Sequence, residues 1–268
     1  LKLPSDIDKI AAQPWYTGVK PSHSNKHYYR ENIGEAETLL FSHLPWIAGN
    51  VGEFFLVPGK EDKPKRKLFL KTSAAPMEVT IPEGKFDISD TEAGDAIRIK
   101  GEMDSKERFQ VYVIDKRETG DPWDVFVERV GVVDHVNKQK QLIHFIVDRK
   151  VDGVIPFSEL TETFVEGNAI AVKLSKYITK RGVRFRVLKA AQTDKEPGPS
   201  IRKNFQETVR VSNGMGFTTT DIFLPPPMVN GKGIQDGDTV SGVALLNYNK
   251  KRGTWGWKAT SVVRTTFK

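Results

Sequence analysis

The chain of 268 residues has 38% hydrophobic and 28% charged residues, which suffices for two or three folded domains and argues against disorder of the whole chain. It contains no cysteine, so disulfides, cysteine-ligated metal sites and thiolate catalysis are excluded. No apolar run approaches the ~20 residues of a membrane-spanning helix and no signal peptide is evident, so we expect a cytoplasmic protein without a membrane partner.

The formal net charge of +7 is unevenly distributed. Basic and acidic residues balance in residues 1–45 and again in residues 46–117. Residues 125–191 carry twelve basic and seven acidic residues, and residues 201–268 carry ten and four. Any nucleic-acid partner is therefore expected to bind the last two thirds of the chain.

Residues 1–45 are predicted to form a loop followed by one short amphipathic helix. Ser24 and Asn25 favour a helix start, and Pro45 ends the pattern. Apolar residues recur between them at helical spacing: Tyr28, Tyr29, Ile33, Ala36, Leu39 and Leu40. A single helix cannot cover its own apolar stripe. It therefore either docks on the next domain or ends a helical region of a longer chain; we favour the second, since residue 1 is not methionine.

A pair of sequence landmarks occurs three times in the rest of the chain. An apolar run ends each time in an aliphatic residue and proline: Ile81-Pro82, Ile155-Pro156 and Leu224-Pro225. Glycine and a short acid or amide follow 12, 11 and 12 residues after the proline: Gly94-Asp95, Gly167-Asn168 and Gly237-Asp238. The pattern predicts three copies of one small domain, at residues 46–118, 124–192 and 201–268.

Each copy is predicted to be a small β-barrel. Short β-branched or aromatic runs follow one another in the second copy, separated by turn residues: 125–127, 130–136, 142–147, 151–155, 169–174 and 183–188. About five strands in roughly 70 residues suit a closed barrel better than a sandwich. The glycine before the fourth strand is expected to adopt a positive φ, and its neighbour to bond nearby backbone amides. In the first copy, residues 58–65 are expected to form a charged loop between two strands.

The second and third copies resemble cold-shock domains. The resemblance rests on residues 131–140, 142–146 and 152–158 of the second copy and on residues 213–217 and 221–224 of the third. It implies OB-fold barrels that bind single-stranded RNA or DNA. The first copy joins the other two by repeat spacing alone. The fold class is therefore all-β, with three tandem five-stranded OB-fold barrels after a short helical segment.

The resemblance also implies which residues meet nucleic acid. In the second copy, the base-stacking positions are His135, His144 and Phe157, beside the lysines Lys138 and Lys140 of a turn. In the third copy they are Phe217 and Phe223. Stacking on aromatic rings binds bases without regard to sequence, and flanking cations neutralise phosphates.

Two basic hairpins extend this set. In the third copy, a turn precedes two tryptophans that would share one face of a strand: Tyr248, Lys250, Lys251, Arg252, Trp255, Trp257 and Lys258. These indoles either stack on bases, or fill the barrel core, or cover the neighbouring domain. The second copy has Lys180, Arg181, Arg184 and Arg186, which either contact phosphates or form a solvated hairpin face.

No metal site, cofactor site or catalytic constellation is apparent. His23 and His27 lack a third ligand nearby, and no phosphate-binding glycine loop precedes a helix. We therefore expect a non-catalytic module that binds single-stranded nucleic acid, RNA rather than DNA, through the second and third barrels. The first barrel or the N-terminal helix remains available to a protein partner. Two alternatives stay open: a protein-interaction or scaffolding module, and an accessory region of a larger nucleic-acid-processing enzyme.

Overall fold

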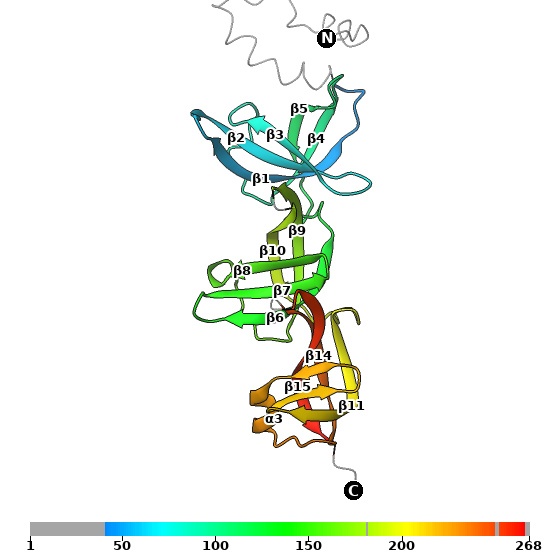
Figure 1. Cartoon of the computed structure of the whole chain (residues 1–268). Coiled ribbons are helices and arrows are strands. Elements are labelled where there is room, and N and C mark those ends of the chain that lie inside the picture. Colours follow the sequence, from blue (N-terminus) through cyan, green and yellow to red (C-terminus); the bar gives the residue numbers. More distant parts are fainter. Residues whose placement is uncertain (1–40, 181, 250–251, 266–268) are drawn as a thin grey trace, which may run out of the picture. The chain divides into compact units, whose positions relative to one another are not determined.

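The computed structural model describes residues 41–180, 182–249 and 252–265, and it divides the chain into two compact units (Figure 1). The first unit ends at Phe126 and the second begins at Val127. Residues 24–40 of the predicted N-terminal helix lie outside the described residues, as do Arg181, Lys250 and Lys251. Within the described part of the chain, no helix has the length and apolar character needed to cross a membrane.

The first unit contains one five-stranded antiparallel sheet. In sheet order its strands are β3 (Met77–Pro82), β2 (Lys60–Leu70), β1 (Ile47–Val57), β4 (Ala96–Met103) and β5 (Phe109–Lys116). Alternate residues of these strands point inward and form one hydrophobic core around Val51, Leu68 and Ile97, which are fully buried. The sheet thus curls around a core of its own, as a small barrel requires.

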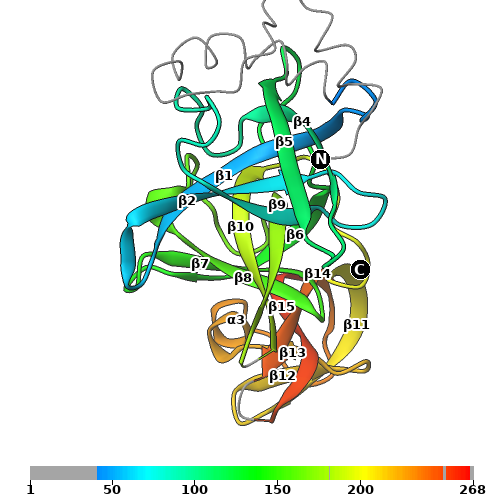
Figure 2. The same cartoon turned by 90° about the horizontal axis from the view of Figure 1, so that it is seen from above.

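The second unit contains two more five-stranded elements. The second sheet comprises, in sheet order, β10 (Gly182–Gln192), β9 (Ala169–Thr179), β6 (Glu128–Asn137), β7 (Leu142–Asp148) and β8 (Val151–Pro156), followed in the chain after β8 by the 3₁₀ turn η2 (Phe157–Glu159). The third is a closed barrel, in the order β11 (Arg202–Ser212), β12 (Met215–Thr218), β13 (Ile222–Leu224), β15 (Thr254–Arg264) and β14 (Thr239–Asn249). The helix α3 (Pro226–Gly231) contacts β12 (Figure 2).

All three elements share one strand connectivity, 1-2-3-5-4 around the barrel. The third barrel closes through a parallel pair between β13 and β15, where Ile222 lies beside Trp257. The first two sheets have the same order and open at the equivalent place, between their third and fifth strands. This is the order of an OB-type barrel, so the all-β class and the closed or nearly closed five-stranded barrels are confirmed.

The repeated glycine has the same role in each copy. Gly94, Gly167 and Gly237 have φ values of +106°, +99° and +85°, which favour glycine. Each donates its amide to a valine carbonyl of the first strand, and the next residue's carbonyl accepts that valine's amide. The side chain of that next residue, Asp95, Asn168 or Asp238, accepts a backbone amide three residues back, at 2.7–2.9 Å. Both expectations for this turn are confirmed.

Two local expectations were wrong. Residues 125–127 form no strand: Val125 and Phe126 lie in a turn, where the Phe126 ring packs 5.1 Å from Phe69 of β2. The expected charged loop at residues 58–65 is a two-residue turn, because β2 begins at Lys60 and Gly59 adopts φ +77°. Charge did not prevent strand formation here, since a strand with one exposed face tolerates charged residues.

The two barrels of the second unit share a hydrophobic cluster. Val132 and Ile146 of the second barrel pack with Ile201, Leu245 and Leu246 of the third, and all five are at most 1% exposed. Burial of these large aliphatic side chains fixes one barrel against the other. One ligand can therefore contact the surfaces of both barrels beside this cluster.

Candidate nucleic-acid interface

A row of four side chains crosses the outer face of the third barrel. Backbone register places Arg210 beside Phe217, Phe217 beside Phe223, and Phe223 beside Lys258, on four adjacent strands. Laterally paired residues lie on the same face of a sheet. The flanking residues Gly216, Ile222 and Leu224 point inward and are buried. We call the outer row the third-barrel platform.

The two phenylalanines of this platform form a ring pair. Their ring centroids are 5.5 Å apart at an interplanar angle of 41°, and both side chains are half-buried. A cation stands at each end of the row, exposed Arg210 on one side and half-buried Lys258 on the other. Flat apolar rings between two cations suit a base flanked by phosphates.

The corresponding face of the second barrel depends on a β-bulge. The register of β6 on β7 shifts between Val133 and His135, so Asp134 is an extra residue. Because of this insertion, Val132 and His135 both face outward although they are three residues apart. His135 then pairs with His144, and His144 pairs with Val154 of β8. These three residues and the adjacent Leu142 form the second-barrel platform.

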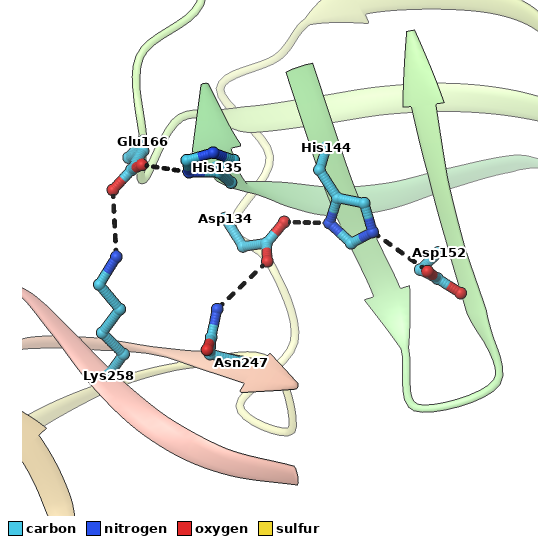
Figure 3. A network of polar contacts seen from close by, with 7 residues as sticks. All are labelled: Asp134, His135, His144, Asp152, Glu166, Asn247 and Lys258. Atoms are coloured by element: carbon cyan, nitrogen blue, oxygen red, sulfur yellow. Dashed lines mark hydrogen bonds and ion pairs between the residues drawn. The ribbon is translucent and has the colours of Figure 1, made fainter. Parts of the chain in front are cut away.

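His144 is held between two carboxylates (Figure 3). Its Nδ1 lies 2.5 Å from Oδ1 of Asp134, and its Nε2 lies 3.1 Å from Oδ2 of Asp152. Burial disfavours the charged ring, but the hydrogen bonds and negative charges of the two aspartates outweigh it and raise the pKa of His144 to about 9. His144 is therefore an imidazolium at neutral pH. The other oxygen of Asp134, Oδ2, accepts from Asn247 of the third barrel at 3.5 Å.

A second chain of contacts joins the two platforms. Oε1 of Glu166 lies 3.0 Å from Nδ1 of His135, and Oε2 of Glu166 lies 3.5 Å from Nζ of Lys258 (Figure 3). The third-barrel platform thus continues through Lys258 and Glu166 to His135 of the second. The predicted residues His135 and Lys258 come from two copies of the repeat and share the carboxylate of Glu166, whereas His144 belongs to the first chain of contacts.

A groove of about 680 Å³ lies where the second-barrel platform meets the last hairpin of the third barrel. It is lined by aromatic, aliphatic, cationic and acidic side chains: Asp134, His135, Asn137, Lys140, Leu142, His144, Arg149, Asp152, Val154, Asn247, Tyr248 and Trp255. We call it the inter-barrel groove. Its aromatic wall is the Tyr248–Trp255 pair, with ring centroids 5.2 Å apart at 60°. The predicted residues Lys140, Tyr248 and Trp255 thus line the same groove as His135 and His144.

The two predicted tryptophans have different surroundings. Trp255 packs against the hydrophobic cluster between the barrels and also lines the groove. Trp257 packs against both that cluster and the third barrel's core, and Nζ of Lys203 lies 4.5 Å from its ring centre. Packing therefore accounts for Trp257, and only Trp255 presents a surface to the groove.

Other predicted residues lie apart from these surfaces. Phe157 belongs to η2 and packs against the core of the second barrel. Lys138 is exposed in the β6–β7 turn, and Arg252 is exposed in the β14–β15 turn. Lys180 is exposed at the end of the β9–β10 hairpin.

The β9–β10 hairpin carries the remaining predicted cations. Arg184 pairs with Tyr177, and Arg186 pairs with Ser175, so both arginines share one face. Both are exposed, and the charge of Arg184 contributes to lowering the pKa of Asp152 in the groove. Arg184 is therefore close enough to Asp152 for the two charges to interact.

Several residues of the site were not predicted from the sequence. Arg210 could have been found from the strand alternation. It follows the buried residue Val209 and therefore faces outward, on the same face as Phe217 of the neighbouring strand. Asp134 and Asn247 could not have been found, since a bulge and a contact between barrels bring them together beside His144, and Glu166 reaches His135 through the loop that bonds to β6 before β9. Among the described residues, no group of three or more histidine or acidic side chains has the arrangement of a metal site.

The second and third barrels match two known domain families. Residues 123–187 match the S1/CSD-like domain 1 of the TOTE conflict systems, and residues 203–262 match the S1/CSD-like domain 2 of the same systems. The chain therefore carries two S1/CSD-like domains in tandem, and the resemblance to cold-shock domains is confirmed for the second and third copies.

Two solved structures are similar to this chain at low identity. Drosophila Unr CSD456 is 12% identical, with 84% of this chain and 98% of that chain covered and a TM-score of 0.26. The p204 HINb domain is 14% identical, with 56% and 95% covered and a TM-score of 0.24. No curated protein matches the chain. The two S1/CSD-like domains and their OB-type connectivity support a nucleic-acid-binding OB-fold module.

Proposed function

We propose that the second and third barrels bind one single strand of nucleic acid across both platforms, without catalysing a reaction on it. The observation that carries the proposal is the continuity of the surface, from the Phe217–Phe223 pair through Lys258, Glu166 and His135 to the groove. A flexible single strand can expose its bases to such rings, whereas the stacked bases of a duplex cannot reach them.

RNA is the better ligand for the inter-barrel groove. Asn137 and Asn247 line it with side-chain amides that both donate and accept hydrogen bonds. The ribose 2′-hydroxyl is also both a donor and an acceptor, and it is the group by which proteins distinguish RNA from DNA. We therefore propose single-stranded RNA as the preferred ligand.

A binding role without catalysis agrees with the state of His144. Its pKa of about 9 keeps the ring protonated at neutral pH, so it cannot accept a proton as a general base. Both of its nitrogens contact carboxylates. The family match adds a context: we propose that this module supplies nucleic-acid recognition to a conflict system of the TOTE kind.

The proposal is tested by titrating the full chain against labelled strands of about sixteen nucleotides, which suits one or two OB folds. Single-stranded RNA, single-stranded DNA and duplex RNA are compared by fluorescence anisotropy at about 50 and 200 mM salt. We expect single-stranded RNA to bind most tightly, single-stranded DNA less tightly and duplex RNA least. The slope of log K on log salt should be about −2 to −3, which corresponds to three or four phosphates. The RNA should be intact after incubation.

The contradicting result is equally specific. If neither single strand binds at low salt, the proposal fails, and a protein-interaction module becomes the better account. If RNA binds but is cleaved or modified, the non-catalytic part fails while the binding surface stands.

A further inference from the structure

Asp152 is the more exposed of the two acidic residues that line the inter-barrel groove, and its carboxylate contacts His144. Its side chain is 51% exposed. Oδ2 contacts Nε2 of His144, and Figure 3 shows the second oxygen turned away from that ring. An ionised carboxylate has about four acceptor positions, so the contacts with His144 and with its own backbone amide leave capacity for a ligand.

Asp152 acts as an acceptor only. The hydrogen bond from His144 is the main influence on it, and with the charges of His144 and Arg184 it lowers the pKa of Asp152. The group is therefore ionised at neutral pH and presents no donor. A ligand edge that meets it must supply hydrogens, because an acceptor placed there would be left unpaired.

The neighbouring side chains are suited to a base. Val154 lies two residues from Asp152 on the same face of β8, and it is half exposed beside His144. Tyr248 and Trp255 form the facing aromatic wall. Lys140 and Arg149 line the same groove and supply positive charge for phosphates. The groove's volume falls in the range of small-ligand sites.

We propose that the inter-barrel groove prefers guanine, whose N1–H and N2–H donate together to the Asp152 carboxylate. Guanine alone among the four bases has two adjacent donors on its Watson–Crick edge. Adenine and cytosine place a ring-nitrogen acceptor beside their amino group, and uracil flanks its single N–H with two carbonyls. A carboxylate therefore discriminates against all three. This inference rests on the proposed function and adds a base preference to it.

The test measures base preference and needs no variant in its first step. The full chain is titrated with a uridine strand of about ten nucleotides that carries guanosine, inosine, N1-methylguanosine, 7-deazaguanosine or uridine at one central position. We expect the guanosine strand to bind about tenfold more tightly than the all-uridine strand. Inosine, which lacks the N2 amino group, and N1-methylguanosine should lose most of this advantage. The 7-deaza base keeps the whole Watson–Crick edge and should retain it.

A pair of variants then assigns the preference to one carboxylate. Asp152→Asn keeps the shape but replaces an acceptor by a donor, so the ratio of guanosine-strand to all-uridine-strand affinity should fall to about one, whatever the change in affinity that both strands share. Glu159→Gln makes the same charge change in η2, outside the groove lining, and should leave the preference intact. Thermal melting of both variants shows whether the fold is kept.

The outcomes separate the two proposals. Equal binding of guanosine and uridine strands by the wild-type chain, or a guanosine preference that survives Asp152→Asn, overturns guanine recognition and leaves single-strand binding standing. Loss of binding to every strand by the wild-type chain overturns the proposed function itself.

Discussion

Lys258 of the third barrel forms an ion pair with Glu166 of the second, with Nζ 3.5 Å from Oε2. Glu166 simultaneously contacts His135 of the second-barrel platform. The ion pair therefore connects the third-barrel platform to the second-barrel platform, and each platform belongs to a different copy of the repeat. An acidic residue at this junction stabilises the arrangement of the barrels, but it also opposes the approach of phosphates.

Removing that acidic charge is expected to strengthen binding. Glu166→Gln should lower the free energy of unfolding by no more than about 1 kcal/mol, since partly exposed ion pairs contribute little. It should raise the affinity for single-stranded RNA, because Lys258 and His135 lose a competing carboxylate. Anisotropy titration at low salt measures the effect, with Glu159→Gln as the control for charge alone. Weaker binding by Glu166→Gln would show that the ion pair is needed to form the surface.

The phenylalanine pair of the third barrel should contribute stacking energy. Phe217→Ala is expected to weaken RNA binding by roughly 1–3 kcal/mol, the range for one base on one aromatic ring. Val263→Ala removes another exposed apolar side chain from the same barrel, away from the platform, and should leave binding unchanged. Equal affinities for Phe217→Ala and the wild-type chain would exclude the platform from the interface.

Arg210 is expected to neutralise one phosphate. Arg210→Ala should weaken binding to every sequence and reduce the slope of log K on log salt by about 0.7, the value for one phosphate of a single strand. Arg264 is an arginine of the same barrel that is paired with Asp238 at 2.7 Å. Arg264→Ala should leave the salt slope unaltered, and an identical change in both variants would mean that only the overall charge matters.

The imidazolium of His144 gives the second unit a pH-dependent stability. The folded-state pKa of about 9 exceeds the unfolded value of 6.5, so the contribution is fully present below pH 6.5 and is lost as the pH rises toward 9. The groups facing His144 are Asp134 and Asp152, and Asp134 also contacts Asn247. The melting temperature should fall between pH 6.5 and 9.

His144→Gln provides the comparison for this pH effect. The variant cannot titrate in that range, so its melting temperature should be lower than wild type at pH 6 and nearly constant up to pH 9. A wild-type melting temperature that does not change between these pH values would contradict a charged His144 between two carboxylates.

The barrel fold and its repeat were largely predictable from sequence, because local chemistry determines them. The turn around Gly167 and Asn168 needs a positive φ and a short acceptor side chain, and both requirements appear in the residue types. The alternation of β-branched residues likewise predicts the strands. Residues 125–127 have the same composition but form no strand, because Val125 and Phe126 pack as a turn in the first unit, a tertiary effect that periodicity does not contain.

The site was predictable only in part. The positions of Phe217 and Phe223 as neighbouring aromatic residues could be predicted from the resemblance to cold-shock domains and from the pairing of adjacent strands. The clamp around His144 does not, because the bulge at Asp134 changes which residues face outward and Asn247 comes from another barrel. For Trp257 the sequence left the alternatives open, since a strand pattern cannot tell an exposed indole from one that packs against a core.

The shared hydrophobic cluster should couple the two barrels in binding. Leu245→Ala is expected to lower the stability of the second unit by about 2–5 kcal/mol. Where the variant remains folded, it should weaken binding of long strands more than binding of strands of about four nucleotides, which fit one barrel. Equal losses for short and long strands would indicate that the barrels bind independently.

Photo-crosslinking tests the continuous two-barrel surface most directly. A single-stranded RNA of about sixteen nucleotides with evenly spaced 4-thiouridines is bound to the full chain, irradiated and mapped by mass spectrometry. We expect crosslinks from one strand both to the Phe217–Phe223 platform and to the Tyr248–Trp255 wall of the groove. Crosslinks confined to residues 41–126, or to only one of these two surfaces, would contradict the account.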